Sequence, residues 1–304
     1  MASRDSDKGG WRREGRFEQR KDLKRKRDTY MSDNLALNYV LTHEAPQSYL
    51  CADVLESHTS RKALVSSMNA VIRADPLPSF RLHHPLLSPQ PLPHLGEFDV
   101  IMITPPWSSE VCTMDALEQL PLRAHNPNTP TFTLAASAVV FIWCGSDPDS
   151  GRTLLDKWNL KRLEDVVWAQ TGQTRVSGVT THGLLRRSKE HCAVGFRKSK
   201  APDAFTHNVD TDIILAPAPP AGEKHCWPKP AAIFEIAERL ATGRRRLHLF
   251  ASDRDSRKGW VSVGPGITSS NFDLKEYRQY FRESTQTDYS NTRVPILLQH
   301  HAKK

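Results

Sequence analysis

Residues 98–107, Phe-Asp-Val-Ile-Met-Ile-Thr-Pro-Pro-Trp, constrain the fold of this chain more than any other stretch. Phe98 to Ile103 are mostly apolar and include no glycine or proline, which predicts a buried strand of a parallel sheet. Two prolines follow, and because neither can donate a hydrogen bond to a neighbouring strand, the strand must end there. Open α/β sheets bind ligands at the carboxyl ends of their strands, so Trp107 is predicted to lie beside a crevice. Taken alone, these residues fit equally well a strand that ends at two prolines and places an aromatic side chain in the core.

Predicted strands and helices alternate along most of the chain. Apolar runs typical of strands occupy residues 48–54, 98–103, 138–143, 164–169, 191–196, 212–215, 246–250 and 260–263. Amphipathic patterns typical of helices occupy residues 59–74, 114–120, 151–158, 230–242 and 273–281. This alternation predicts an α/β fold with a doubly wound mixed sheet, and it leaves little room for a second folded domain.

Two loop features accompany these elements. Residues 75–95 are rich in proline and are predicted to be an irregular connection that leads into the strand at Phe98. Pro230 suits the first turn of the helix that follows it, and Gly243 is expected to cap that helix at its carboxyl end.

Charge separates the amino-terminal end of the chain from the rest. The formal net charge is +8 over 304 residues, and residues 1–27 hold eleven Lys or Arg against five Asp or Glu. We therefore expect a basic disordered tail at residues 1–30, a folded domain at residues 31–285 and a short tail at residues 286–304. Residues 24–27, Lys-Arg-Lys-Arg, suit nuclear import or nucleic-acid binding, and a solubilising tail explains them equally well.

Cysteine spacing and hydropathy argue against a secreted, a metal-binding or a membrane-spanning protein. The five cysteines are scattered without a Cys-x-x-Cys pair, which predicts a reduced intracellular protein with no metal site. No apolar run approaches membrane-spanning length, so no membrane partner is expected. The amino terminus is charged from Arg4 onward, which is unlike a signal peptide.

Several blocks of sequence occur together in one order. They read Thr104-Pro-Pro-Trp107, Phe141-Ile-Trp-Cys-Gly145, Lys189-Glu-His-Cys192, Arg244-Arg-Arg-Leu-His-Leu-Phe250, and Gly259-Trp260 followed by Val263-Gly-Pro265. From about Tyr49 to Phe281 the chain resembles the N6-adenine methyltransferase (MT-A) family. The resemblance implies a Rossmann-like class I methyltransferase fold with a permuted motif order, in which the catalytic strand precedes the cofactor-binding strand.

The first block departs from the family at its key residue. In that family an Asp-Pro-Pro-Trp signature orients the exocyclic amine of adenine toward the methyl group of S-adenosylmethionine. Here the residues are Thr104, Pro105, Pro106 and Trp107. A hydroxyl is a weaker acceptor than a carboxylate, so the resemblance implies a degenerate motif with no catalytic residue. Trp107 keeps the active pattern, which leaves the question of residual base binding open.

The last two blocks also lack side chains that the family uses at its site. Positions at which catalytic members contact the cofactor read Ser252, Arg254 and Asp255, then Pro265 and Gly266. Proline and glycine offer no side chain for the hydroxyls or the carboxylate of the cofactor. The resemblance is to the pseudo-enzyme branch of the family, and it implies that this chain binds no cofactor. A catalytic homologue would hold S-adenosylmethionine and form a heterodimer with this chain.

Basic residues cluster near three predicted strand ends: Arg186, Arg187 and Lys189; Arg244, Arg245 and Arg246; and Arg254, Arg257 and Lys258. We predict that the three clusters line one groove that attracts a nucleic-acid backbone. Within this set, Arg246 is the residue most suited to a structural role, because it leads directly into an apolar strand. For any one arginine taken singly, a solvated side chain paired with a neighbouring acidic residue is the simpler interpretation.

Three functions are compatible with these residues. The first is a non-catalytic nuclear subunit that scaffolds a catalytic N6-adenine methyltransferase and helps to bind nucleic acid, either RNA or, in a related complex, DNA. The second is an active S-adenosylmethionine-dependent enzyme that uses the Thr-Pro-Pro-Trp motif. The third is a nucleic-acid-binding protein that keeps the fold without a methyltransferase partner. We expect the first, with RNA favoured over DNA by overall resemblance.

Overall fold

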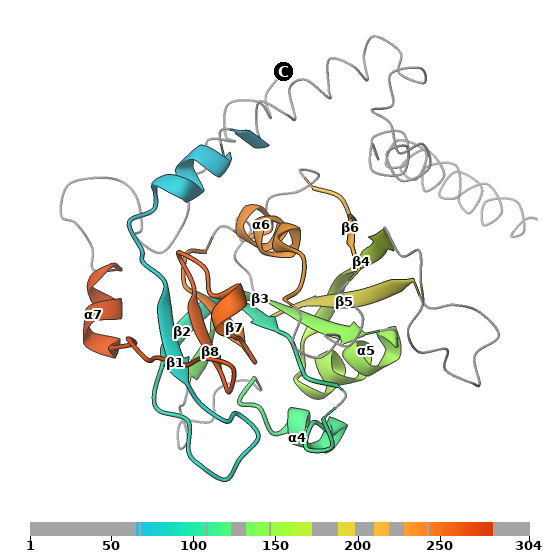
Figure 1. Ribbon diagram of the computed structural model, residues 1–304, viewed down its shortest axis with the longest axis horizontal. Helices are drawn as coiled ribbons and strands as arrows, with labels where there is room; N and C mark the ends of the chain where they lie inside the picture. Colours follow the sequence, from blue (N-terminus) through green and yellow to red (C-terminus); the bar gives the residue numbers. More distant parts are fainter. Residues whose placement is uncertain are drawn as a thin grey trace, which may run out of the picture. The chain divides into compact units, whose positions relative to one another are not determined.

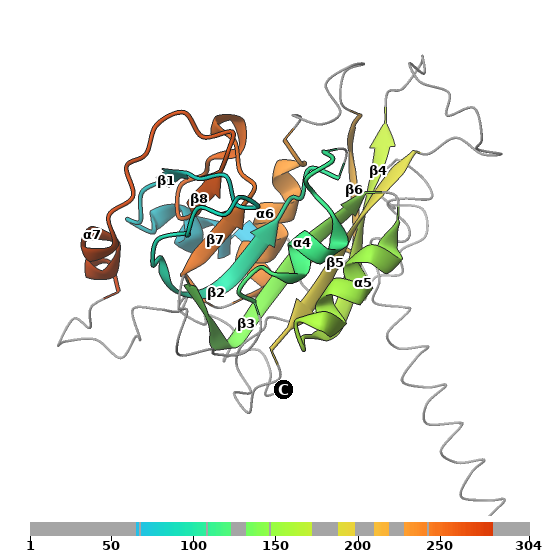
Figure 2. The same cartoon turned by 90° about the horizontal axis from the view of Figure 1, so that it is seen from below.

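The computed structural model describes residues 65–66, 68–107, 109–122, 132–145, 147–171, 188–197, 210–218, 228–241 and 243–281. These residues form an eight-stranded sheet with helices on both faces (Figure 1). The strands are β1 (Phe80–His83), β2 (Gly96–Ile103), β3 (Phe132–Gly145), β4 (Lys161–Thr171), β5 (Lys189–Phe196), β6 (Ile213–Pro217), β7 (Arg246–Leu249) and β8 (Val261–Gly264). Their order across the sheet is β1-β8-β7-β2-β3-β5-β4-β6 (Figure 2).

Every strand except β5 runs in one direction. β5 pairs antiparallel with β3 and with β4, whereas all other neighbouring strands are parallel. We call the side of the sheet where the parallel strands end, next to Thr104 and Gly145, the carboxyl rim. The opposite side, next to Phe80 and Arg246, is the amino rim. Because β5 is reversed it begins at the carboxyl rim, and the doubly wound mixed sheet predicted from the sequence is confirmed.

Four labelled helices cover the two faces. α4 (Met114–Glu118), α5 (Pro148–Lys157) and α7 (Leu274–Gln279) contribute to the buried cluster on one face, and α6 (Ala231–Leu240) contributes to the cluster on the other. Figure 2 shows α4 and α5 in front of the sheet and α6 behind it. Thr113, Asp147 and Asp273 cap α4, α5 and α7, because each side chain accepts a backbone N–H of the first turn. Residues 68–74 are also helical.

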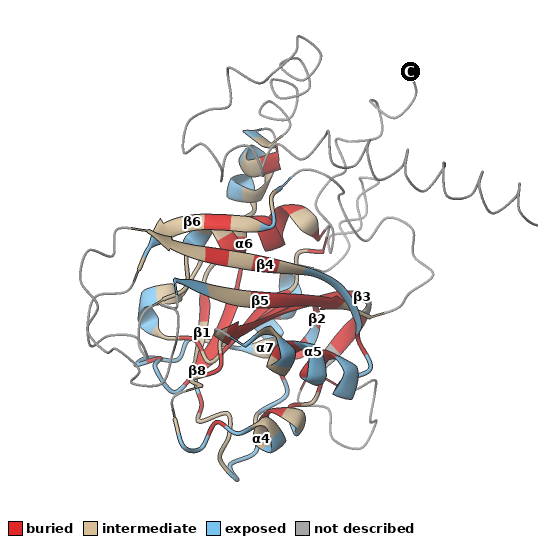
Figure 3. Cartoon of the chain, turned by 90° about the vertical axis from the view of Figure 1, so that its right-hand side faces the viewer, coloured by how far each residue is buried: buried red, intermediate tan, exposed pale blue. Residues whose placement is uncertain are grey.

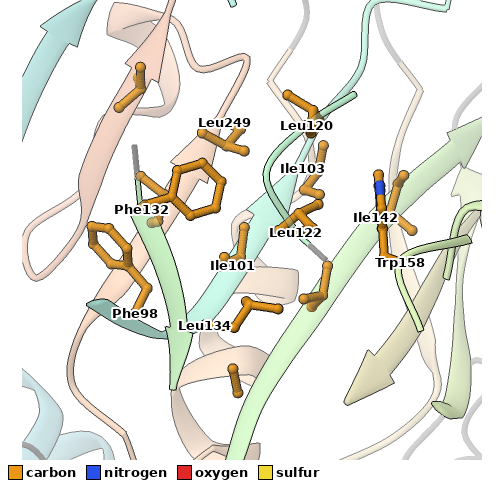
Figure 4. Close-up of a cluster of buried hydrophobic side chains, with 14 of the residues drawn as sticks. Phe98, Ile101, Ile103, Leu120, Leu122, Phe132, Leu134, Ile142, Trp158 and Leu249 are labelled. Atoms are coloured by element: carbon orange, nitrogen blue, oxygen red, sulfur yellow. The ribbon is translucent and has the colours of Figure 1, made fainter. Parts of the chain in front are cut away.

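Successive side chains of a strand point to opposite faces of the sheet, so one strand contributes to the buried apolar clusters on both faces. On β2, Ile101 and Ile103 belong to the cluster that includes α5, and Val100 and Met102 belong to the cluster that includes α6. Figure 4 shows the first of these clusters, where side chains of β2, β3 and β7 gather. Central strands buried on both faces appear red in Figure 3. Each fully buried Leu or Ile stabilises the fold by about 1.5–3 kcal/mol, so the sheet centre is a rigid base for the loops at its rims.

The prediction of an irregular connection over residues 75–95 is wrong in part. Phe80–His83 form β1, an outer strand that pairs in parallel with β8. Its other side is closed by Asn271 Oδ1 and Ser270 Oγ, which accept the N–H groups of Arg81 and His83 at 2.6 and 2.8 Å. Four residues between prolines carry too short a pattern to be distinguished from a loop, and pairing with β8 decides their conformation.

The predicted role of Gly243 as a helix cap is also wrong. α6 ends at Leu240, and the capping residue is Ala241, in an extended conformation. A Cβ at Gly243 would lie 2.1 Å from the Cβ of Asp99. Glycine stands at residue 243 because the backbone there passes directly against β2.

All described residues belong to a unit that spans residues 61–304. Within them, no helix is long and apolar enough to cross a membrane. The predicted domain boundaries near residues 30 and 285, the predicted strand at residues 48–54 and the basic run at residues 24–27 lie outside the described residues.

Candidate functional site

The Thr104–Trp107 turn begins where β2 reaches the carboxyl rim. The Thr104 N–H makes a last sheet bond to the Leu249 carbonyl of β7 at 3.1 Å. Pro105 and Pro106 then lead the chain out of the sheet, because neither has an N–H to continue the ladder. The strand and its abrupt end, both predicted from the sequence, are confirmed.

Trp107 is held in place at the carboxyl rim. Its backbone N–H bonds to the Pro105 carbonyl at 2.9 Å, and its indole Nε1–H donates to the Trp143 carbonyl of β3 at 2.6 Å. A Cβ at Gly145, which has a φ of 62°, would stand 3.9 Å from the indole Cδ1. The half-buried ring therefore lies against the end of β3 and is tied to it by a hydrogen bond.

The hydroxyl of Thr104 is fully engaged with β7. Its Oγ1 lies 3.0 Å from His248 Nε2, 3.2 Å from the Leu249 carbonyl and 3.3 Å from the Phe250 carbonyl. A hydroxyl has one proton to donate, and the two carbonyls can only accept it. Both partners are satisfied when Thr104 donates to a carbonyl and accepts the Nε2–H of His248.

His248 is a residue that the sequence analysis did not single out. It lies in β7 between Leu247 and Leu249, is 0 % exposed, and its ring meets Phe234 of α6 edge-on at 5.1 Å. Burial lowers the pKa of His248, because the charged imidazolium would lose its hydration, so the ring is neutral near pH 7. The sequence signal was a lone polar residue in an apolar strand beside the motif.

This contact changes what the turn can do chemically. An adenine amine is positioned by strong acceptors, and a carboxylate offers two oxygens where Thr104 offers one hydroxyl. When that hydroxyl accepts the Nε2–H of His248, one of its two lone pairs is already used. Thr104 therefore offers fewer and weaker acceptors at the end of β2 than a carboxylate would.

The loop after β7 closes on itself at the carboxyl rim. The Ser252 N–H and hydroxyl both donate to Asp255 Oδ1, at 2.6 and 3.0 Å, in a reciprocal capping box. Ser252 also forms a bridge with Gly266, where a Cβ would lie 2.8 Å from the Ser252 Cβ. Serine and aspartate at these positions therefore bond each other and the backbone.

A second set of bonds ties this loop to the one after β8. The Asp253 N–H donates to the Gly266 carbonyl at 3.0 Å, and the Asp253 carboxylate accepts the N–H and the hydroxyl of Thr268. These bonds lower the pKa of Asp253. The side chains of Ser252, Asp253 and Asp255, which could otherwise bind a ribose or an amino-acid group, are therefore already paired with the chain.

Lys189 and a neighbouring cluster also lie at the carboxyl rim. Lys189 is exposed at the start of β5. Next to it, Glu190 accepts from Lys229 at 2.6 Å, and the Lys229 ammonium lies 5.3 and 5.9 Å from the ring centroids of Trp143 and Trp168. Sequence analysis did not find this cation–π cluster, because its members come from four separate segments.

Two of the predicted groove arginines are paired with carboxylates at the amino rim. Arg244 makes a two-pronged bond to Asp75, at 2.7 and 2.6 Å. Arg245 donates two hydrogen bonds to the Asp99 carboxylate, at 2.9 and 2.7 Å, and also forms an ion pair with Glu97. Burial opposes both charges, but the hydrogen bonds prevail and lower the pKa of Asp75 and raise that of Arg245.

Arg246 is 1 % exposed and so presents almost no surface to solvent in this chain. Its Nε and Nη2 atoms have no hydrogen-bond partner among the described residues. Burial lowers the pKa of Arg246, and the charges of Glu238, Asp75 and Asp99 oppose that shift. These are the surroundings of a structural arginine.

The third cluster is divided between the two rims. Arg254 is exposed in the short helix η1 (Asp253–Asp255) at the carboxyl rim. Arg257 pairs with buried Glu238 at 2.8 and 2.9 Å, and Lys258 donates to the Arg73 carbonyl at 3.1 Å, both close to the start of β8.

The prediction of one groove lined by all three clusters is therefore wrong for the described residues. The parallel pairing of β2, β7 and β8 places Arg244–Arg246, Arg257 and Lys258 at the amino rim. Lys189 and Arg254 lie at the carboxyl rim, and Arg186 and Arg187 are outside the described residues. Contact of any of these residues with nucleic acid stays a prediction.

Comparison with known proteins agrees with this geometry. Residues 98–266, which run from β2 to the loop after β8, match the MT-A70 family. The Drosophila melanogaster "N(6)-adenosine-methyltransferase non-catalytic subunit METTL14" is 31% identical over 281 residues, covering 86% of this chain and 70% of that protein. Its Xenopus tropicalis namesake is 30% identical over 294 residues, 86% of this chain and 62% of that protein.

A catalytic relative matches a shorter region. The human "N(6)-adenosine-methyltransferase catalytic subunit METTL3" is 29% identical over 180 residues, 56% of this chain and 28% of that protein. This chain spans about three fifths of the length of the Xenopus relatives. The family match extends over more than half of the chain and includes the Thr104 turn, the β7 strand and the closed rim loops. The chain belongs to the MT-A70 family of N6-adenine methyltransferases.

Proposed function

We propose that this chain is the non-catalytic subunit of a heterodimeric N6-adenine methyltransferase, in which it scaffolds a catalytic homologue and helps to hold the nucleic acid. Similarity to proteins named as non-catalytic subunits supports the scaffold role. Their names specify adenosine, which supports RNA over DNA as the substrate. S-adenosylmethionine then binds in the catalytic partner and not in this chain.

The observation that carries the proposal is the engaged hydroxyl of Thr104. A working motif needs a free, strong acceptor at this position, and Oγ1 lies within 3.3 Å of three protein partners instead. The closed loops after β7 and β8 support the same conclusion for the cofactor, because Asp253 and Asp255 already accept from the chain.

Calorimetry with S-adenosylmethionine tests the loss of the cofactor site. We expect no saturable heat with the full chain alone and normal binding by the heterodimer, with one site per complex. Micromolar binding by the isolated chain would contradict the proposal. Two sites per heterodimer would contradict it as well.

Paired substitutions in the heterodimer distinguish a scaffold from an active enzyme. Thr104→Ala in this chain should leave methyl transfer intact, and Asp→Ala in the Asp-Pro-Pro-Trp motif of the partner should abolish it. The assay is run on RNA and on DNA oligonucleotides that contain adenine. Loss of activity with Thr104→Ala, at an unchanged melting temperature, would favour the second function, an active Thr-Pro-Pro-Trp enzyme.

Co-expression tests the partner. We expect the two chains to co-elute at micromolar concentration, because an obligate interface buries well over about 1,000 Å². Separate elution would contradict the first function and favour the third, a nucleic-acid-binding protein with no methyltransferase partner.

The basic residues at the carboxyl rim are the proposed nucleic-acid contacts of this chain. Lys189 and Arg254 are exposed there, and Arg186 and Arg187 precede β5 in the sequence. Arg187→Glu and Lys189→Glu should weaken binding equally for all sequences and flatten its salt dependence, because each phosphate contact releases counterions. Unchanged binding in both variants would exclude these residues.

A nuclear location is proposed from the Lys24–Arg27 run. A fluorescent fusion of the full chain should accumulate in the nucleus and lose that accumulation when the four residues are changed to Ser. Nuclear accumulation of the Ser variant without the partner present would show that this run is not the signal.

A further inference from the structure

Strands β7 and β8 present two unlike faces. Toward α5 they place Leu247, Leu249, Val261 and Val263, all in one apolar cluster. The alternate residues, which point toward α6, are polar: Arg246, His248 and Ser262. A face buried under a helix and composed of polar residues needs hydrogen-bond partners for each of them.

Each of these three side chains has a buried atom with no hydrogen-bond partner among the described residues, and His248 and Ser262 lie on paired positions of the two strands. His248 Nδ1 and Ser262 Oγ are both fully buried and make no hydrogen bond to a described residue. A buried polar atom without a partner is rare in native proteins, because it loses its hydration without compensation. The contact with Thr104 involves only the other nitrogen of the ring, Nε2.

The sheet register places these two residues side by side. His248 pairs with Ser262 across β7 and β8, so their side chains point from adjacent strands, about 4.8 Å apart, to the same face. No hydrogen bond joins Nδ1 and Oγ directly. A single small molecule that bonds both atoms would satisfy each of them.

The identity of that molecule follows from protons and charge. Because Thr104 gives its proton to a backbone carbonyl, we assign His248 as the Nε2–H donor to Thr104, so Nδ1 of the neutral ring is an acceptor and needs a donor. The Ser262 hydroxyl can donate or accept. An anion is disfavoured, since Glu238, Asp75 and Asp99 already act on the charge of Arg246, the cation of this face, and would repel a further negative charge. A small neutral donor that also accepts is water.

We propose that one ordered water molecule bridges His248 Nδ1 and Ser262 Oγ beneath α6, and that it holds His248 in the tautomer that engages Thr104. The water donates to Nδ1 and accepts from the Ser262 hydroxyl, which leaves the ring proton on Nε2. Ser262 is thereby a positioning residue for the Thr-Pro-Pro-Trp turn, through His248. The inference rests on the internal geometry of β7 and β8 and holds whether or not the proposed subunit function is correct.

The first test is spectroscopic and uses the full chain with ¹⁵N-labelled histidine, His248 being assigned by loss of its signals in His248→Gln. We expect the Nε2–H tautomer at neutral pH, with an Nδ1 shift typical of a hydrogen-bonded acceptor. Ser262→Ala should move that shift toward the value of an acceptor without a bond. Ser269→Ala, an exposed serine in the loop after β8, is the matched control and should change nothing.

An Nδ1 shift typical of an unbonded acceptor in the unmodified protein would overturn the proposal, and so would the Nδ1–H tautomer. The same holds for a shift that Ser262→Ala leaves unchanged. If Ser262→Ala does not fold, the Nδ1 shift and the tautomer in the unmodified protein are sufficient to test the proposal. None of these outcomes depends on partner or cofactor binding, so they are distinguishable from a failure of the proposed function.

A double-mutant cycle supplies the second test. Ser262→Ala should lower the melting temperature by about 2–4 °C in the unmodified background, because the bridge loses one end. In the His248→Phe background the same change should have no effect or raise the melting temperature, since no acceptor remains to be bridged. Equal shifts in both backgrounds would show that the two side chains share no molecule.

Discussion

The two rims of the sheet use polar side chains in different ways. At the amino rim, charged groups meet as ion pairs that are mostly buried, such as Arg244 with Asp75 and Arg245 with Asp99. At the carboxyl rim, hydroxyls and short acidic side chains bond to nearby backbone, as Asp253 does with Thr268. The basic residues of the amino rim that were predicted to line a nucleic-acid groove are thus largely held in ion pairs, whereas the loops of the carboxyl rim are bonded to one another.

Because of this difference, substitutions at the two rims are expected to affect different properties: stability at the amino rim and function at the carboxyl rim. Removing one partner of a buried ion pair leaves an uncompensated charge, whereas an exposed capping bond can be replaced by water. We therefore expect substitutions at the amino rim to unfold the protein before they affect a partner. Substitutions at the carboxyl rim should leave the fold intact and report on what this chain does in a complex.

The largest effect is expected for Arg245→Glu. A second carboxylate would face Asp99 and Glu97, and breaking a buried pair costs about 3–5 kcal/mol, or about 10 °C in melting temperature. Lys189→Glu at the carboxyl rim is the matched charge reversal and should shift stability by less than about 0.5 kcal/mol. Urea unfolding gives the free energy of unfolding of both variants. Equal values would show that the two rims do not differ in their contribution to stability.

Gly243→Ala should come next. The added Cβ would lie 2.1 Å from the Cβ and 2.4 Å from the Cγ of Asp99, so the backbone must move and disturb the Arg245 pair. We expect a loss of about 1–3 kcal/mol in the free energy of unfolding. A variant as stable as the unmodified protein would mean that this part of the amino rim is not tightly packed.

Thr104→Val should have a smaller effect, with a loss of about 1 kcal/mol, because the Nε2–H of buried His248 loses its acceptor. Methyl transfer by the heterodimer should be unchanged. Thermal unfolding and a methyl-transfer assay on the same preparation provide the two readouts. Lost activity with unchanged melting would place Thr104 in the chemistry rather than in the structure.

The smallest effect is the pH dependence of stability between about pH 7 and pH 5. Burial lowers the pKa of His248 and of His191 below the usual value of 6.5, so the unfolded chain binds more protons than the folded chain in this range. Stability should therefore decrease as pH falls through 6.5 toward the folded pKa values. Nearby charges modify the shift, with Asp255 raising the pKa of His248 and Lys189 lowering that of His191.

His248→Gln is the control for this pH effect, because it removes the titration of the buried ring. Unfolding free energies measured at several pH values should show a flatter dependence in the variant. Carboxylates whose pKa is lowered by partners, including Asp75 and Asp165, begin to lose their contribution only below their usual value of 3.8. A dependence of equal slope in both proteins would show that His248 is not a neutral buried group.

The sequence by itself determined the α/β architecture, the central strand before the Pro-Pro turn and the family. These features depend on local patterns, such as the apolar run from Phe98 to Ile103 and the missing N–H groups of Pro105 and Pro106, and local patterns survive in any context. Substitution of Thr104 for the family's acidic residue was also visible.

Only the tertiary structure decided where the charged and polar side chains find their partners. Arg244 and Asp75 are 169 residues apart in sequence, and Arg245 and Asp99 are 146 apart, so the spacing along the chain carries no sign of either pair. Strand order sets these contacts: parallel pairing of β7 with β2 brings Arg245, just before β7, beside Asp99 near the start of β2, and the order β1-β8-β7 brings the segment before β1, with Asp75, to the same rim as Arg244. His248 meets Thr104 for the same reason, at the opposite ends of the same two strands.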